Sequence, residues 1–178
     1  WTPCSSTAAR PMPEIDIVLV GPLHEGNVGF AARAMKNFGF SDLVLVDPCP
    51  LGELARACAM HASDVLEHAR TMTLEEVFSA YPLIVATTGG LTKSVCRSMR
   101  MPYYTPGEVR ELIRDIRGRV AILFGRENLG LSNEEIRRCD LICTINASQE
   151  YPILNISHAV GIVCYELAGL PRGTYRLA

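Results

Sequence analysis

The sequence predicts an α/β fold in which one parallel sheet is flanked by helices on both of its faces. Short apolar runs rich in β-branched residues alternate along the chain with longer segments of helical periodicity. The apolar runs contain few polar positions, which is typical of parallel strands that are buried on both sides. No internal repeat or interdomain linker interrupts the alternation, so the 178 residues are expected to hold one domain.

The first half of the chain begins with a βαβ unit of about 30 residues. Strands are expected at Asp16–Val20 and Leu43–Val46, and Gly39 is placed to end the helix between them as its C′ residue. That helix is expected to bury one face, made of Phe30, Ala31, Ala34, Met35 and Phe38. Two further helices, Leu54–Met60 and Leu74–Ala80, then precede a third strand at Leu83–Thr87.

The second half resumes after an irregular stretch that reaches Tyr104. Thr105, Pro106 and Glu108 are a capping signature for a helix that runs to about Ile116. The remaining elements are expected to be a strand at Val120–Phe124, a loop at 125–130, a helix from Ser132 to about Arg138, a strand at Asp140–Ile145, a loop at Asn146–Pro152, and a helix that buries Ile156, Val160, Val163 and Leu167. The exit loops of neighbouring parallel strands form a ligand crevice at the carboxyl edge of such a sheet.

Composition excludes several classes of protein. The net charge of −2 gives no overall field for a polyanion, and no apolar run approaches the roughly 20 residues of a membrane span. Seven cysteines without a Cys-x-x-Cys pair favour a reducing cytoplasm and argue against a metal site.

Residues 1–13 are expected to be a flexible tail or a remnant of expression, 14–171 the folded domain, and 172–178 a short C-terminal tail.

The loop after the first strand is rich in glycine but matches neither common nucleotide motif. Gly21, Gly26 and Gly29 have the wrong spacing for the dinucleotide fingerprint, and the loop lacks the Lys-Ser/Thr ending of a P-loop. Two polar residues, Asn27 and Arg33, interrupt a helix that is otherwise suited to packing. The glycine spacing therefore disfavours a Rossmann-type nucleotide binder.

Three segments together resemble a known family. They are GPLHEGNVGFAARAMKNFGF, FGRENLGLSNEE and YPILNISHAV, and they are similar in order and separation to the three motifs of the TrmH group within the SPOUT RNA methyltransferases. Within that group the chain is most similar to the TrmJ-like tRNA 2′-O-ribose methyltransferases, and the resemblance extends from Ile15 to Gly169. It implies a SPOUT fold with a C-terminal deep trefoil knot, a homodimer, and S-adenosylmethionine as cofactor.

The resemblance also implies which residues form the site. The cofactor is expected to contact Thr87, Thr88, Gly89, Gly125, Ile145, Pro152, Ile153 and Leu154. The expected catalytic residues are Arg33, Asn27, Glu127 and Asn155. A guanidinium is almost never deprotonated, so we expect Arg33 to act as a charged clamp on the RNA phosphate and the developing alkoxide.

Many family members have Ser-Leu-Asn where this chain has Ile153-Leu154-Asn155, so any contact that depends on the serine hydroxyl is lost. His158 lies early in the last helix and is expected to be a surface or packing residue.

Two groups of basic residues differ in their surroundings. Lys93, Arg97 and Arg100 have no acidic neighbours and are expected to bind RNA phosphates. A second group alternates with acidic residues and is expected to be a solvated helix face; its members are Arg110, Arg114, Arg117 and Arg119.

The expected function is therefore tRNA 2′-O-methylation, by resemblance of cytidine or uridine at position 32 of the anticodon loop. Ribosomal RNA methylation and a non-catalytic RNA-binding module are the alternatives that the sequence leaves open.

Overall fold

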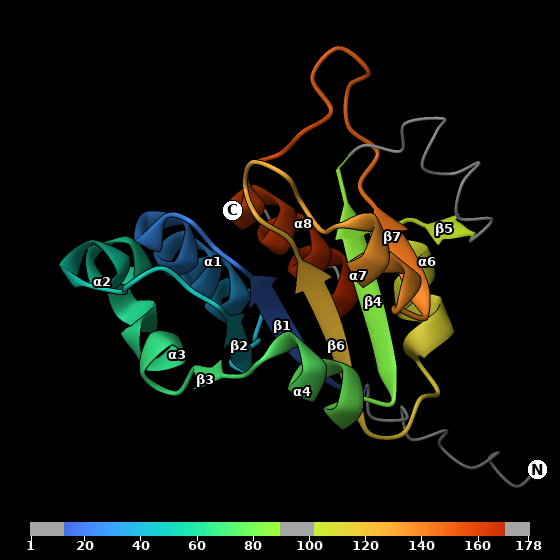
Figure 1. Ribbon diagram of the computed structural model, residues 1–178, viewed down its shortest axis with the longest axis horizontal. Coiled ribbons are helices and arrows are strands. Elements are labelled where there is room, and N and C mark those ends of the chain that lie inside the picture. Colours follow the sequence, from blue (N-terminus) through green and yellow to red (C-terminus); the bar gives the residue numbers. More distant parts are fainter. Residues whose placement is uncertain (1–12, 90–101, 170–178) are drawn as a thin grey trace, which may run out of the picture.

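A computed structural model describes residues 13–89 and 102–169, which form one sheet of seven parallel strands (Figure 1). The order across the sheet is β3-β2-β1-β6-β4-β7-β5. The strands are β1 (Glu14–Val20), β2 (Leu43–Val46), β3 (Arg70–Thr71), β4 (Leu83–Thr88), β5 (Tyr103–Tyr104), β6 (Arg119–Phe124) and β7 (Leu141–Thr144). The parallel α/β sheet predicted from the sequence is confirmed.

Helices cover both faces of this sheet. They are α1 (Glu25–Asn37), α2 (Glu53–Ala59), the 3₁₀ turn η1 (Met60–Ala62), α3 (Ser63–Glu67), α4 (Leu74–Ala80), α6 (Pro106–Ile113), α7 (Asn133–Arg137) and α8 (Ile156–Ala168). The larger core lies where α1, α3, α6 and α8 pack on side chains such as Ile17, Leu19 and Ile122. The smaller core lies on the opposite face, where α4 and α7 pack on Val18, Val20 and their neighbours. Alternate residues of β1 therefore enter opposite cores, as the period of a strand requires.

Local capping chemistry explains where the helices begin and end. Thr73, Thr105 and Ser132 each start a helix with a complete capping box. Gly39 has φ +82°, and the amides of Gly39 and Phe40 donate to the carbonyls of Lys36 and Met35. This is a Schellman motif, and it confirms Gly39 as the C′ residue that ends α1.

The buried face of α1 differs in part from the prediction. Its buried residues are Val28, Gly29, Ala31, Ala32 and Met35. Phe30 lies beside this stripe and is 47% exposed, so its assignment to the buried face was wrong. Gly29 faces α2 so closely that a Cβ there would lie 2.2 Å from the carbonyl oxygen of Ala55. Which residues of α1 are buried therefore depends on its contacts with the sheet and with α2, and not on hydrophobicity alone.

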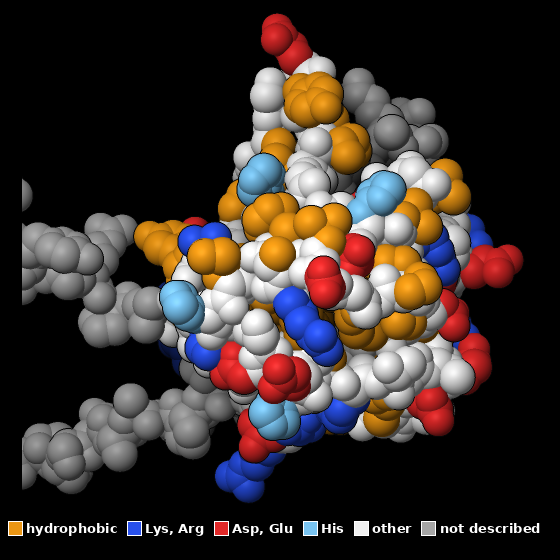
Figure 2. All heavy atoms as spheres, turned by 90° about the vertical axis from the view of Figure 1, so that its left-hand side faces the viewer, with side chains coloured by type: hydrophobic (Ala, Val, Ile, Leu, Met, Phe, Trp, Pro, Cys, Tyr) orange, Lys and Arg blue, Asp and Glu red, His pale blue; other side chains and the backbone are white. Residues whose placement is uncertain are grey.

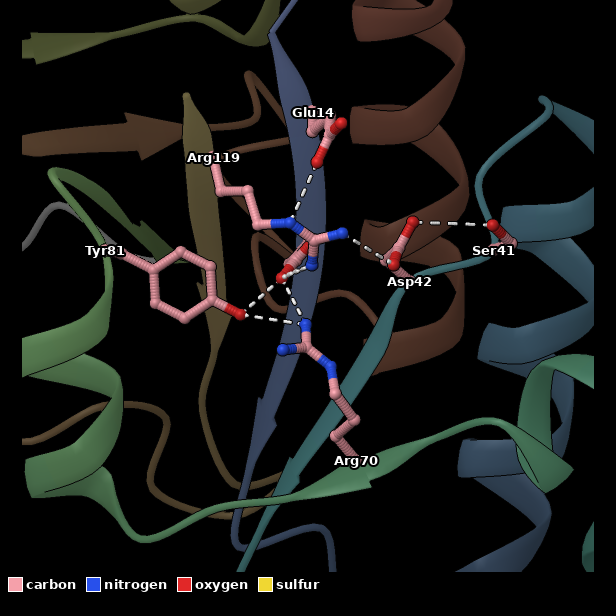
Figure 3. Close-up of polar contacts among 7 residues, drawn as sticks. Glu14, Ser41, Asp42, Arg70, Tyr81 and Arg119 are labelled. Atoms are coloured by element: carbon pink, nitrogen blue, oxygen red, sulfur yellow. Dashed lines mark hydrogen bonds and ion pairs between the residues drawn. The ribbon is translucent and has the colours of Figure 1, made fainter. Parts of the chain in front are cut away.

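Asp16 is a fully buried carboxylate at the amino end of β1. Figure 3 shows three of its partners, Arg70, Tyr81 and Arg119, pointing toward one another. Asp16 accepts hydrogen bonds from Arg70, from the hydroxyl of Tyr81, and from Nη1 of Arg119 at 3.0 and 3.2 Å. Burial, followed by the neighbouring Asp16, raises the pKa of Tyr81 to about 12, so its hydroxyl keeps its proton.

Arg119 also donates to Glu14 at 2.9 Å and to Asp42 at 3.3 Å. Its assignment to a solvated helix face was therefore wrong, because Arg119 is in β6, opposite Glu14 of β1, and its guanidinium reaches Asp16 two residues further along β1. The sequence analysis also missed β3 and β5, whose two residues each are too short to show a strand pattern. No helix in the described ranges is long and apolar enough to cross a membrane.

The buried carboxylate leads to a stability prediction. We expect Asp16→Asn to lower the free energy of unfolding by about 3 kcal/mol, because two guanidinium groups lose their shared charged partner. Urea unfolding measures the change. Glu14→Gln is the matched control: it removes another carboxylate partner of Arg119, but an exposed one, and should cost less than about 1 kcal/mol. Equal effects of the two substitutions would contradict the role given to Asp16.

Candidate functional site

A cavity of about 330 Å³ opens at the carboxyl edge of the sheet, where the loops after β4, β6 and β7 meet. Its volume lies within the range of small-molecule sites. Three segments line it, together with the first turns of α8. The lining residues are Thr87, Thr88, Gly89, Phe124, Gly125, Arg126, Glu127, Asn128, Leu129, Gly130, Leu131, Cys143, Ile145, Pro152, Ile153, Leu154, Ile156, Ala159 and Val163.

All eight residues predicted to contact a cofactor lie in this lining. Thr87, Thr88 and Gly89 come from the end of β4, and Gly125 follows β6. The other four are Ile145, which follows β7, and Pro152, Ile153 and Leu154, which precede α8. The pairing of β4 with both β6 and β7 brings these segments together although the chain separates them by tens of residues.

Two glycines in the lining lie against neighbouring groups that leave little or no room for a side chain. A Cβ on Gly125 would lie 2.1 Å from the carbonyl carbon of Gly130, because the loop folds back on itself there. A Cβ on Gly89 would lie 3.4 Å from Cδ1 of Ile153. The cavity wall is therefore backbone at these positions, and polar backbone groups can approach a ligand closely.

Glu127, Asn27 and Asn155 form a chain of hydrogen bonds that joins three separate loops; we call it the polar clasp. Nδ2 of Asn155 donates to Oδ1 of Asn27 at 3.1 Å, and Nδ2 of Asn27 donates to Oε1 of Glu127 at 3.0 Å. The backbone amides of Leu23 and His24 donate to the same carboxylate at 2.8 and 3.3 Å. Three of the four residues predicted to be catalytic are thus brought into direct contact.

Both ends of the polar clasp have a second structural role. Asn155 is the N-cap of α8, and its Oδ1 accepts hydrogen bonds from the amide and the hydroxyl of Ser157 at 2.9 and 2.8 Å.

Burial would raise the pKa of Glu127, but the hydrogen bonds from Asn27 and from the amides of Leu23 and His24 outweigh this effect, so its pKa lies below the usual value. Glu127 is therefore an ionised acceptor whose oxygens are already engaged, which makes it a poor general base.

Arg126 is a lining residue that the sequence analysis did not single out. Its guanidinium makes a two-pronged contact with Glu135, with both nitrogen–oxygen distances at 3.1 Å. Its side chain also passes Gly21, where a Cβ would lie 3.0 Å from it. The sequence shows that Arg126 is next to Gly125 of the second motif, but it does not show that Glu135, nine residues away, is its partner. Arg126 is the one cation among the described lining residues, and Glu135 neutralises it.

Cys143 also lines the cavity. Burial raises the pKa of its thiol to about 12, so the group is a neutral, apolar part of the wall near pH 7. A role as a nucleophile is therefore not supported.

Arg33 lies outside the cavity lining, on the exposed side of α1. It is six residues beyond Asn27, or about 9 Å along the helix. Within the described part of the chain, no hydrogen bond or ion pair engages its guanidinium. The side chain is thus free to meet a charged group from outside. His158 is exposed on α8, as predicted, and Lys93, Arg97 and Arg100 lie outside the described residues.

The outer sides of α1 and α8 together present an apolar surface; we call it the α1–α8 face. Its exposed members are Phe30, Ile162 and Tyr165. The two helices pack on each other, and Phe38 and Tyr165 meet edge to face with ring centroids 5.7 Å apart. Figure 2 looks onto the molecule from the side of α1 and α2 and shows hydrophobic side chains gathered across the upper part of this view. Arg33 lies on the same side of α1 as Phe30, one turn further along.

Comparison with known proteins identifies a family that this chain matches. A model described as the SpoU rRNA Methylase family matches residues 14–165. A curated relative from Methanocaldococcus jannaschii, named tRNA (cytidine-2'-O-)-methyltransferase TrmJ, is 39% identical over 155 residues. The match covers 86% of this chain and 66% of that protein. The chain thus spans just under two thirds of the relative's length.

Solved structures share the same fold. A probable methylase family protein from Haemophilus influenzae has a TM-score of 0.80 and 34% identity, covering 88% of this chain and 65% of that one. The SpoU methyltransferase AviRb from Streptomyces viridochromogenes, solved with the cofactor AdoMet, has a TM-score of 0.67 and 18% identity. That match covers 89% of this chain and 60% of the other, and at this identity it shows the fold alone.

The polar clasp predicts a pH-dependent stability. The folded-state pKa of Glu127 lies below the unfolded value of about 4.3, so its carboxylate stabilises the fold above that pH and loses the effect as the pH falls through the folded pKa. We expect the gap in unfolding free energy between the wild type and Glu127→Gln to be constant from about pH 5 to 7 and to shrink below about pH 4.

Urea unfolding at each pH measures this gap. Glu134→Gln, an exposed position on α7, has the same change of charge and serves as the control. A Glu127→Gln gap that is unchanged at about pH 3 would contradict the clasp as an ionised acceptor.

Proposed function

The chain belongs to the SpoU rRNA methylase family, and from this premise we propose that it transfers a methyl group from S-adenosylmethionine to a ribose 2′-hydroxyl of RNA. One observation carries the proposal. Eight positions from three separate segments, chosen by resemblance to that chemistry, all line one cavity.

The cavity suits S-adenosylmethionine in size and in chemistry. Gly89 and Gly125 make part of its wall from backbone, whose polar groups can approach an adenine or an amino-acid tail closely. The ionised carboxylate of Glu127 at the cavity edge favours a cationic ligand such as a sulfonium. When bound, this cofactor supplies an electrophilic methyl group, and the protein residues supply binding, orientation and charge.

Arg33 is the residue that we assign to the RNA. It is exposed and charged, whereas Arg126 is neutralised by Glu135. A guanidinium that holds the phosphate beside the target ribose would fix the 2′-hydroxyl in line for attack and stabilise the negative charge that develops on its oxygen. Since arginine keeps its proton, the hydroxyl proton leaves to another acceptor, such as water or a phosphate oxygen.

The polar clasp acts as a positioning device in this proposal. Asn27, Glu127 and Asn155 satisfy one another and the backbone, so they hold the three motif loops around the cavity and touch the reacting atoms only through them. Lys93, Arg97 and Arg100 remain candidates for further phosphate contacts.

We infer that the RNA is a tRNA, on the basis of the relative's printed activity on cytidine in tRNA. The substrate nucleotide would then be a pyrimidine of the anticodon loop, and the enzyme would work in the cytoplasm. The family description names ribosomal RNA, so ribosomal RNA is the second candidate. The C-terminal trefoil knot, typical of the SPOUT fold, belongs to the same proposal.

We also propose a homodimer that forms through the α1–α8 face. Phe30, Ile162 and Tyr165 expose large apolar surface on two adjacent helices, and a second copy of the chain would cover it. Arg33 would then lie at the border between two protomers, beside the RNA-binding surface of both.

The function is tested by incubating the protein with labelled S-adenosylmethionine and either tRNA or ribosomal RNA transcripts, followed by mapping of 2′-O-methylated riboses. We expect Arg33→Ala to reduce the rate of methyl transfer about 10²-fold to 10³-fold, because an electrostatic contact to the transition state is lost. The affinity for S-adenosylmethionine, measured by calorimetry, should stay the same.

Arg117→Ala removes another exposed arginine, which precedes β6 at the edge of the sheet away from the cavity, and is the matched control. It should methylate at the wild-type rate. Full activity of Arg33→Ala would refute its assignment, and a wild type that binds no S-adenosylmethionine would refute the proposed function.

The proposed interface is tested with Phe30→Glu. A charge at this position should convert a dimer into monomers in light scattering, because it cannot be buried without a partner. Leu112→Glu on α6 is the control, since Leu112 is as exposed as Phe30, at 47%, but lies off the α1–α8 face. A wild type that is monomeric at all concentrations would rule out the interface.

A further inference from the structure

Three large apolar side chains stand exposed around the mouth of the cavity. Tyr151 is 81% exposed, Leu129 is 80% exposed and Ile153 is 56% exposed. Leu129 and Ile153 belong to the cavity lining, and Tyr151 is next to the lining residue Pro152. These three residues are called the apolar rim. Ile153 is also an expected cofactor contact, but neither the cofactor contacts nor the polar clasp accounts for Tyr151 and Leu129.

The apolar rim is built from two loops that approach the cavity from different strands. Leu129 is in the loop after β6, whereas Tyr151 and Ile153 are in the loop that joins β7 to α8. Figure 1 shows this second loop projecting well beyond the carboxyl edge of the sheet. Across the described chain, Tyr151 has no hydrogen-bond or ring partner. Exposed apolar groups that cluster beside a cavity are typical of a binding surface.

We propose, on the basis of the function proposed above, that the apolar rim holds the base of the target nucleotide, with Tyr151 as its stacking platform. The chemistry of the ribose requires the base to be nearby. The acceptor hydroxyl is on C2′ and the base is on the adjacent carbon C1′, so a hydroxyl presented to the cavity places its base at the rim.

A base in this position has lost its neighbours in the RNA stack. A paired base inside a helix is stacked on both faces and is recessed in the groove, so its ribose cannot enter the cavity mouth without disruption of the helix. The flat face of Tyr151 replaces one lost neighbour, and Leu129 and Ile153 supply apolar contact around it. Stacking is tolerant of sequence, so the rim selects an unpaired nucleotide and leaves the identity of the base to other contacts.

The test uses a hairpin RNA with 2-aminopurine in its loop, whose fluorescence is quenched when the base stacks on an aromatic ring. We expect the wild type to quench the signal and Tyr151→Ala to abolish the quenching and to weaken hairpin binding about tenfold or more. Tyr151→Phe should retain both, because the ring and not the hydroxyl makes the contact. Leu129→Ala should weaken hairpin binding to a smaller extent.

Three further measurements separate stacking from other roles. In methyl transfer, Tyr151→Ala should raise the KM for RNA more than it lowers kcat, and calorimetry should give an unchanged Kd for S-adenosylmethionine. Leu112→Ala, which truncates an exposed leucine on α6, is the control and should behave as the wild type. When the 2-aminopurine is at a paired position of a duplex, addition of the wild type or of any variant should leave its fluorescence unchanged.

Several outcomes would overturn the proposal. Quenching that persists in Tyr151→Ala, or is absent in the wild type, would remove the stacking platform. An equal loss of S-adenosylmethionine affinity would make the apolar rim part of the cofactor site, and a change of oligomeric state in light scattering would make it a protein interface. A wild type that quenches the hairpin but transfers no methyl group would instead refute the proposed function and leave the rim as an RNA-binding surface.

Discussion

The ionised carboxylate of Glu127 is the point on which the site depends. It lies three residues after the end of β6 and accepts hydrogen bonds from two backbone amides of the loop after β1. Through Asn27 and Asn155 it is linked to the start of α8. Hydrogen bonds to a charged group contribute about 1.5–3 kcal/mol each, which is enough to order loops that the sheet alone would leave loose. These hydrogen bonds join the loop after β6, which lines the cavity, to the loop after β1 and to the start of α8.

The two edges of the sheet separate stability from chemistry. At the amino edge, Asp16 is fully buried among Arg70, Tyr81 and Arg119, and this network ties β1 to β6 and to the segments beside them. At the carboxyl edge, the loops after β4, β6 and β7 surround the cavity. A rigid set of strands between the two edges lets the loops vary in chemistry without loss of the fold.

Charge at the site is distributed so that few groups stay unpaired. Arg126 and Glu135 neutralise each other, and Glu127 is saturated by donors. Arg33 remains exposed, on a protein whose net charge is −2. Attraction of RNA to this surface would therefore come from a few placed cations and from the apolar rim, and not from the field of the whole molecule.

The sequence by itself determined the local structure: five strands within two residues of their observed ends, the helix starts at Thr105 and Ser132, and Gly39 as a helix stop. These features depend on residues a few positions apart, which periodicity and turn chemistry reveal. Resemblance added the eight residues that line the cavity, because family motifs record contacts that periodicity does not. Only the tertiary structure decided the partners of Asp16 and Glu127, the exposure of Phe30 and the ion pair of Arg126. Most of these contacts join residues about 50 to 130 positions apart, and strand register and helix packing alone bring such residues together.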